Sequence, residues 1–228
     1  MNERNWNRLG GVSGAVFAVL LLVGIIPGGV PPAFGTDSRG VVDYFTSHQA
    51  GLQVTFFAGN VLPTMLGTLF SAVLFVGLWR IERSARWGAV IGLVGAATIG
   101  AFAAALSIVW SILVYDAGRL GTSTPLASVL YDGTVEAGAA SIFIEGLVAF
   151  GFGMALARLT PGWRRVGLAG VVVGLLNFVV GIAMFAAEFK TGAVPLLGIG
   201  TFVIWTVVVG IGLATRGVGA SSDTQNSV

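Results

Sequence analysis

Cysteine is absent from this sequence of 228 residues, and histidine occurs once, as His48. The absence of cysteine excludes disulfide bonds and thiolate-bound metals. A single histidine also excludes a haem held by histidines from two helices of the same chain. We therefore expect neither a metal nor a cofactor, and we interpret His48 as a side chain at the membrane interface.

Charged residues are scarce as well, at 10% of the chain, whereas a soluble domain carries about 25%. The net charge of +2 is too small to indicate a nucleic-acid partner. Catalytic motifs are also missing: there is no HExxH, no GxSxG with a histidine partner, and no phosphate-binding loop that ends in lysine. We expect no catalytic residues, and the sequence favours a protein that is not an enzyme.

Hydrophobic residues make up 55% of the chain and form six long runs with few charges. A run of about 20 apolar residues can cross a bilayer as a helix. The sequence therefore predicts an all-α integral membrane protein. Its six helices form a single bundle domain over residues 1–216, and a disordered cytoplasmic tail follows over residues 217–228. The predicted spans are Leu9–Ile26, Val54–Leu78, Trp87–Val114, Val129–Leu156, Val166–Ala187 and Leu196–Ala214.

Basic residues distinguish the two ends of the predicted bundle. With a cytoplasmic N-terminus, nine of the twelve lysines and arginines lie on the inner side, and Arg39, Arg119 and Lys190 lie on the outer side. Basic residues in short loops favour the cytoplasmic side. We therefore predict that both termini are cytoplasmic. The inner residues are Arg4, Arg8, Arg80, Arg83, Arg86, Arg158, Arg164, Arg165 and Arg216.

Tryptophan, arginine and glycine recur together where spans one, three and five begin. Trp6, Trp87 and Trp163, with neighbours such as Arg164 and Arg165, are typical of anchors at the head-group level. Glycines at small-xxx-small spacing permit close helix packing, so we expect the odd-numbered spans to form the tight inner part of the bundle. A threefold repeat of one helical hairpin is an alternative explanation. The glycine pairs are Gly10/Gly14, Gly24/Gly28, Gly88/Gly92 and Gly170/Gly174.

The longest predicted connection, Ile26–Leu52, contains a helical pattern. Prolines exclude a regular helix from its first part, after which Asp37 or Ser38 can cap a helix. We predict a short amphipathic helix over Asp37–Ala50, lying on the outer membrane face between spans one and two. Its apolar side carries Val41, Val42, Tyr44, Phe45 and His48.

One acidic residue, Glu145, falls near the middle of a predicted span. It lies eleven residues before the inner end of span four, which is roughly 16 Å along a helix. Asn177 lies at a similar depth in span five, and we predict a hydrogen bond between the two side chains, with Asn60 and Ser107 as alternative partners. A carboxyl group in a low-dielectric site can exchange a proton and bind a cation. The alternative, which we favour, is a neutral acid that fixes helix register.

Other acidic residues lie nearer the outer side. Asp132 and Glu136 are four residues apart and share a face of span four. Glu136 and Glu145 are nine residues apart, about 180° around a helix, which argues against a proton path along this span. Asp132 and Glu136, together with Asp116 and Glu188, form either an acidic vestibule or, as we favour, a solvated rim.

Four segments carry a resemblance to known sequences: "VVDYFTSHQAGL", "LFVGLWRIERSARW", "ALARLTPGWRRVGLAG" and "FVIWTVVVGIGL". From about Asn5 to Arg216, the chain resembles a broad group of uncharacterised six-span membrane proteins, abundant in actinobacteria and related to a bacterial membrane domain of unknown function. The resemblance implies a multi-pass protein of the bacterial plasma membrane with an outer helix between spans one and two. It implies no activity and no catalytic residues.

Three functions are compatible with these features. We favour a non-catalytic binding or accessory protein that acts through membrane lipids or a membrane protein partner, because reactive motifs are missing and little of the chain lies outside the membrane. The second is a transporter or channel for a small solute or cation, which would use Glu145 and the acidic outer side and would need a homo-oligomer. The third is an intramembrane enzyme acting on lipid, which would need paired acids or a histidine near one interface.

Overall fold

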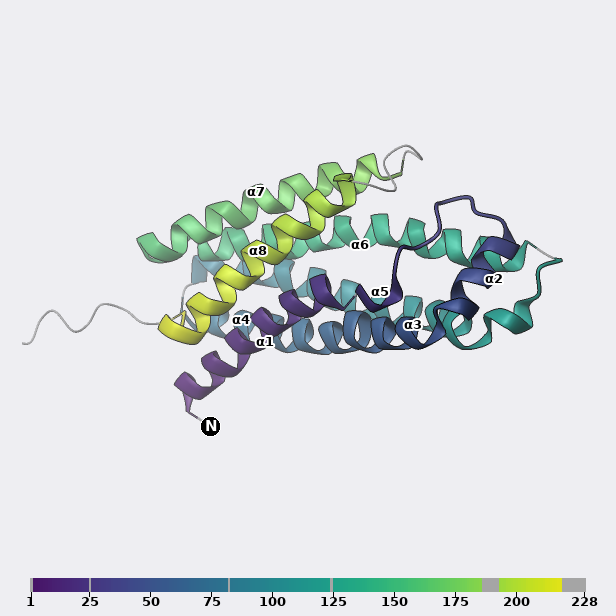
Figure 1. Cartoon of the computed structure of the whole chain (residues 1–228). Coiled ribbons are helices and arrows are strands. Elements are labelled where there is room, and N and C mark those ends of the chain that lie inside the picture. The colour runs from purple at the N-terminus through teal and green to yellow at the C-terminus, as the bar shows by residue number, and fades with distance from the viewer. Residues whose placement is uncertain (1, 25, 82, 124, 186–192, 219–228) are drawn as a thin grey trace, which may run out of the picture.

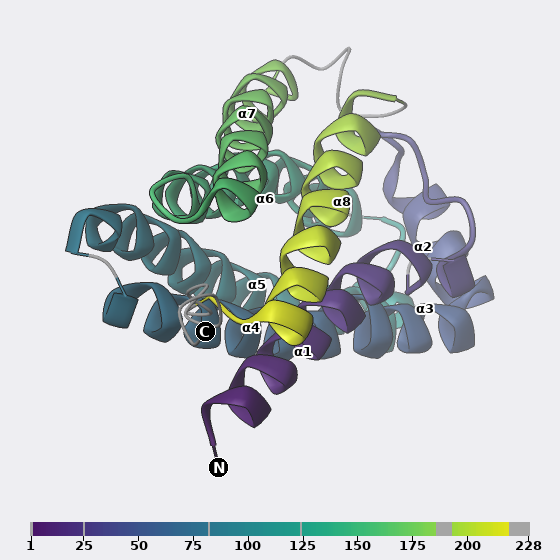
Figure 2. The ribbon, with the colours of Figure 1, turned by 90° about the vertical axis from the view of Figure 1, so that its left-hand side faces the viewer.

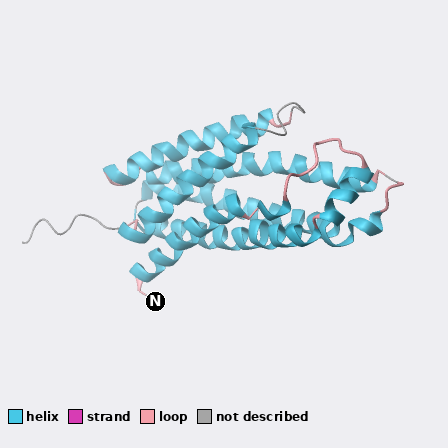
Figure 3. Ribbon diagram, in the orientation of Figure 1, coloured by secondary structure: helices cyan, strands magenta, loops and turns pink. Residues whose placement is uncertain are grey.

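Helices account for nearly all of the residues that the structure describes, which are 2–24, 26–81, 83–123, 125–185 and 193–218 of a computed structural model (Figure 1). No strand occurs among these residues, which confirms the predicted all-α class (Figure 3). Six of the described helical segments are long and apolar enough to cross a membrane, as the sequence predicts. The start of the first helix and the end of the last one lie at the same end of the bundle (Figure 1).

The helices extend beyond most of the predicted spans. The second span is continuous from Gln49 to Ile81 and includes a π-helical turn. The third has 35 residues, about 52 Å, which exceeds the roughly 30 Å of a hydrocarbon core. The described elements are α1 (Glu3–Val23), α2 (Ser38–Ser47), α3 (Gln49–Phe56), the π turn η2 (Phe57–Val61), α4 (Leu62–Ile81), α5 (Arg86–Leu120), α6 (Leu126–Leu156), α7 (Pro161–Ala183) and α8 (Ala193–Arg216), with single 3-10 turns at Ile26–Gly28 and Arg83–Ala85.

The connection between α5 and α6, predicted as the second outer loop, is much shorter than the sequence predicts. Most of the polar segment between Val114 and Val129 belongs to α5 and α6, and only residues 121–125 separate these helices. Polar side chains outside the hydrocarbon layer do not end a helix. Gly121 does, because its φ of 71° lies in the left-handed region that glycine adopts without strain.

The inner helix of the bundle is α6, and the expectation that the odd-numbered spans are innermost is wrong. In its apolar stretch 61% of the residues are buried, compared with 35%, 22% and 33% for α1, α5 and α7. Helix α6 contacts α5 and α7 extensively and also meets α8 (Figure 2). The glycine pairs within α1, α5 and α7 do mark close contacts, but each occupies only one stripe of its helix, and Gly24/Gly28 lies beyond the end of α1. Small residues recur around much more of α6, among them Ala139, Gly146, Ala149, Gly151, Gly153 and Ala155.

Helix α2 docks on the ends of α5 and α6 that lead into their connecting turn. The Asp37 carboxylate caps it by accepting from Gly40 N at 2.8 Å. Val41 and Phe45 are buried against α5 and α6, so the apolar side predicted from the sequence contacts protein. The helix is shorter than predicted because the chain turns at His48 into α3.

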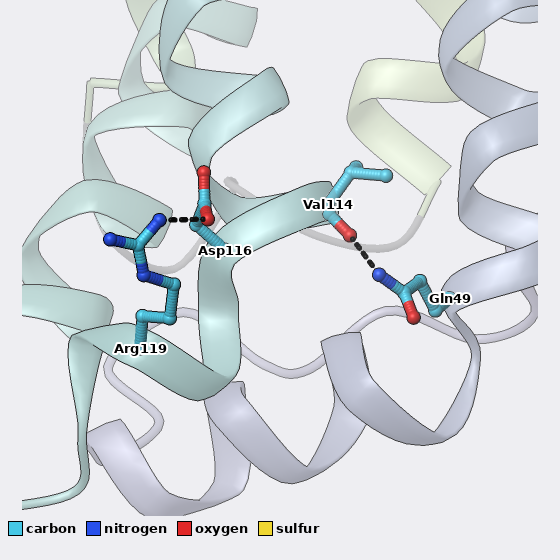
Figure 4. Close-up of polar contacts among 4 residues, drawn as sticks. All are labelled: Gln49, Val114, Asp116 and Arg119. Atoms are coloured by element: carbon cyan, nitrogen blue, oxygen red, sulfur yellow. Dashed lines mark hydrogen bonds and ion pairs between the residues drawn. The ribbon is translucent and has the colours of Figure 1, made fainter.

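Hydrogen bonds from two tyrosines and one glutamine hold α2, α3 and the loop before α2 in place. The hydroxyls of Tyr44 and Tyr131 donate to the carbonyl oxygens of Gly28 at 2.7 Å and Pro32 at 2.6 Å. Burial raises the pKa of Tyr44, so its phenol remains a donor. Gln49 Nε2 donates to Val114 O at 3.2 Å and ties the start of α3 to α5 (Figure 4).

The last described residues pack on the bundle. Trp163 Nε1 donates to Gly217 O at 3.2 Å, and Val218 is 6% exposed. Gly217 and Val218 therefore do not belong to a disordered tail, because α7 holds the backbone of Gly217 and the core buries the side chain of Val218. The remainder of the predicted tail, residues 219–228, lies outside the described residues.

Candidate functional site

Glu145 lines a cavity of about 200 Å³ inside the bundle. Glu145 is 7% exposed, so the acid is buried within the bundle. The cavity is lined by residues of α1, η2, α4, α5, α6 and α8 and is partly open at the surface of the bundle. Among the described lining residues, Glu145 is the only one that titrates.

The walls of this cavity, named the Glu145 cavity below, are mainly apolar. Phenylalanines come from four different helices, and a few small polar side chains lie between them. Thr64, Thr68 and Ser141 donate their hydroxyl protons to carbonyl oxygens of their own helices at 2.8 Å. Their oxygens can accept from a ligand, but their protons are already used. The aromatic residues are Phe17, Phe70, Phe102 and Phe202, and the polar ones are Asn60, Thr64, Thr68, Ser71, Ser141 and Glu145.

One carboxyl oxygen of Glu145 lacks a partner. Oε2 is buried and makes no hydrogen bond to any described residue. Burying an ionised carboxylate without a partner is costly, so the neutral acid is favoured in the empty cavity. A ligand that brings a hydrogen-bond donor or a positive charge would satisfy this oxygen.

Asn60 reaches the cavity from an irregular turn of the second span. The π turn Phe57–Val61 contains it, and Pro63 follows one turn later. Such π turns re-aim side chains and are frequent at functional sites. The sequence signal for this wall is an asparagine followed by a proline inside an apolar run, which predicts a local irregularity but no cavity.

The predicted hydrogen bond between Glu145 and Asn177 does not form. Asn177 is fully buried, and both of its side-chain polar atoms lack a partner among the described residues. It lies beside α8, where a Cβ added at Gly198 would be 3.2 Å from Asn177 Oδ1. Gly146 occupies the contact of α6 with α7, and Glu145, about 100° away around the helix, faces the cavity instead. Equal depth was therefore insufficient to pair the two side chains.

The other predicted acids do not gather with Glu145. Asp132 accepts from Gly35 N at 3.0 Å and so holds the loop before α2. Asp116 pairs with the exposed Arg119 at 3.1 Å (Figure 4). Neither these acids nor Glu136 lines the Glu145 cavity, and Glu188 lies outside the described residues.

The hydrogen-bond partners of His48 lie within four residues of it in the chain. Its Nδ1 lies 2.9 Å from Ser47 Oγ and 3.1 Å from Tyr44 O. In the described part of the chain, no three histidine, aspartate or glutamate side chains cluster as metal ligands. Ser107, a predicted alternative partner of Glu145, instead donates to Ala103 O at 2.7 Å.

The predicted interface anchors occupy different surroundings. Trp87 is 79% exposed, and Arg164 and Arg165 are exposed as well. Trp6 packs partly against the core, whereas Trp163 is only 8% exposed. The ring of Trp163 lies against Gly212, and its N–H is bonded to Gly217, so it holds α7 to α8 and does not face lipid head groups.

The fold and the cavity define a class: a multi-pass helical membrane protein with an acidic residue inside its bundle. Comparisons of the chain with protein-family models, curated proteins and solved structures found no match. The chemistry of the Glu145 cavity is therefore the feature of this chain that indicates a function.

Proposed function

We propose that this chain is a non-catalytic binding protein of the bacterial plasma membrane that takes a small, largely apolar molecule into the Glu145 cavity. The observation that supports this proposal is the buried, unpartnered Glu145 Oε2 on the wall of a cavity of about 200 Å³. Acidic groups within membrane spans are costly and usually functional. Binding pockets combine apolar walls with a few polar groups that orient the ligand.

Binding accounts for the site more simply than a transport pathway along the outer acids. Transport requires access to the site from both sides of the membrane, and the outer acids do not lead into the cavity.

Membrane lipids are the expected partners of the exposed apolar surface, which includes Val172 and Val179 on α7. A single chain supplies the described walls of the cavity, so the proposal requires neither a homo-oligomer nor a membrane protein partner.

Hydrophobic carbodiimide provides a direct test of entry into the cavity. Dicyclohexylcarbodiimide dissolves in lipid and reacts with protonated carboxyl groups. We expect it to modify Glu145 in membranes, because this acid is buried in apolar surroundings without a basic partner. Peptide mass spectrometry would locate the adduct, and Glu145→Gln should abolish it.

Glu136→Gln is the matched control, since it removes the same group from the same helix outside the cavity wall. This variant should retain the adduct at Glu145. A folded protein whose Glu145 remains unmodified would contradict the proposal, because small apolar molecules would then not reach the site.

We further propose that both termini are cytoplasmic and that α2 lies on the outer side. Nine basic residues fall on the predicted inner side, and the start of α1 and the end of α8 lie at the same end of the bundle, which supports this orientation. In this cysteine-free chain, Ser123→Cys should react with a membrane-impermeant maleimide in intact cells, and Ser84→Cys only after permeabilisation. Each change replaces one atom in an exposed turn. Reaction of both cysteines from the same side would exclude this topology.

A further inference from the structure

The Glu145 cavity combines one carboxyl group with aromatic rings from several directions. Phe17, Phe70 and Phe202 come from α1, α4 and α8, and Phe102 comes from α5. The face of an aromatic ring carries partial negative charge and attracts cations. No lysine or arginine is present among the described lining residues to neutralise the acid from within.

We infer that the ligand of the Glu145 cavity is a small amphiphilic cation, an amine or quaternary ammonium with an apolar substituent, whose charge pairs with the Glu145 carboxylate. This inference rests on the proposed binding function and specifies its ligand class. Three observations support it: the unpartnered Glu145 Oε2, the phenylalanine-rich wall, and the absence of a basic lining residue in the described chain.

Metal ions and anions fit these walls less well. Hard cations such as Ca²⁺ take about six to eight oxygen ligands, whereas the cavity offers a single carboxylate and a few small polar groups. The described residues hold no cluster of metal-ligating side chains. An anion would meet a carboxyl group without any basic residue beside it. An organic cation needs only one counter-charge, and its apolar part fits the aromatic wall.

Binding of this cation requires the release of a proton. In the empty cavity Glu145 is neutral for the reason given above, whereas the cation pairs with its ionised form. The exchange balances as Glu145–COOH plus cation giving the Glu145–COO⁻·cation pair plus H⁺. No other described lining residue titrates on α1, η2, α4, α5, α6 or α8. The residues that α7 packs against Gly146, namely Gly174 and Phe178, are not titratable either.

The test uses the full chain in lipid nanodiscs with two probes of the same shape. Benzyltrimethylammonium keeps its charge at every pH, and neopentylbenzene is its neutral isostere. The cation should protect Glu145 from dicyclohexylcarbodiimide at a concentration at least about ten times lower, after correction for partitioning into lipid. Calorimetry in two buffers of different ionisation enthalpy should show about one proton released per cation bound.

The pH dependence has a defined sign. Protons compete with the cation for the Glu145 carboxylate. In the pH range where Glu145 is protonated in the ligand-free site, the affinity should therefore fall about tenfold for each pH unit of acidification, because one proton is exchanged. It should become independent of pH once the acid is already ionised in the empty site. Glu145→Gln should lose cation binding, and Glu136→Gln should retain it. If Glu145→Gln fails to fold, Glu145→Asp should retain proton release with a changed affinity.

Each contrary result has one meaning. Equal protection by both probes without proton release would overturn the cation assignment and leave the proposed binding function intact. Failure of both probes to protect a reactive Glu145 would also overturn the cation assignment. An unreactive Glu145 in a folded chain would instead contradict the proposed function itself.

Discussion

Replacing Phe45 with alanine should detach α2 from the bundle while the six spans remain folded. Phe45 is 1% exposed, and its ring centroid lies 5.7 Å from that of Trp110 and 6.2 Å from that of Tyr131. Truncating a buried phenylalanine costs about 3–5 kcal/mol. The spans contact one another directly, so we expect them to stay packed without this contact.

Hydrogen exchange would measure the effect locally. We expect the amides of α2 to exchange more than roughly 100-fold faster, since about 1.4 kcal/mol corresponds to a factor of ten. Amides in α6 should remain protected. Asp43→Ala is the control, because Asp43 lies on the exposed side of the same helix. Unchanged protection of α2 in the Phe45→Ala variant would show that the helix is not held by this cluster.

Detachment of α2 would also loosen the chain that leads to the Glu145 cavity. Tyr44 holds the carbonyl of Gly28 beyond the end of α1, and Gln49 holds the start of α3 against α5. Helix α1 contributes Leu21 to the cavity, and α3 continues into the π turn that carries Asn60. Helix α2 therefore helps to set the position of two cavity walls.

Hydropathy predicted the six spans because an apolar run of this length has few stable alternatives to crossing a membrane. It did not predict where the helices end. The predicted third span ends at Val114, before the charged Asp116 and Arg119, yet α5 continues through both residues to Leu120. A helix that leaves the hydrocarbon layer needs only a polar surface to continue, and hydropathy does not distinguish this case from a loop.

The rise of a helix gives the position of Glu145 along its span, but not the direction in which its side chain points. Rotation of α6 about its axis is set by close contacts with its neighbours, such as the one between Gly146 and Gly174 O. The cavity itself arises from small residues on different spans, including Gly67 on α4 and Gly100 and Ala103 on α5. Contacts between residues far apart in sequence determine such a void, so a single sequence does not reveal it.

Gly153→Ala should destabilise the bundle, although the change adds only one methyl group. A Cβ at this position would lie 2.6 Å from Val171 N and 2.8 Å from Gly167 O. Both are backbone atoms of α7, which cannot move aside as a flexible side chain can. Helices α6 and α7 would have to separate, and overpacking of this kind costs about 1–3 kcal/mol. Their close backbone contact is also what drives association in lipid.

Gly138→Ala provides the matched control on the same helix, where an added Cβ meets no atom within 4 Å. Alanine favours a helix over glycine by about 1 kcal/mol, so this variant should be as stable as the parent or more so. Thermal unfolding of the two variants in one detergent would compare them, and Gly153→Ala should unfold at the lower temperature. Equal midpoints would mean that α6 and α7 do not approach as closely as these contacts require. A lower midpoint for Gly153→Ala alone would show that backbone contact, and not helix propensity, holds the inner helix of the bundle.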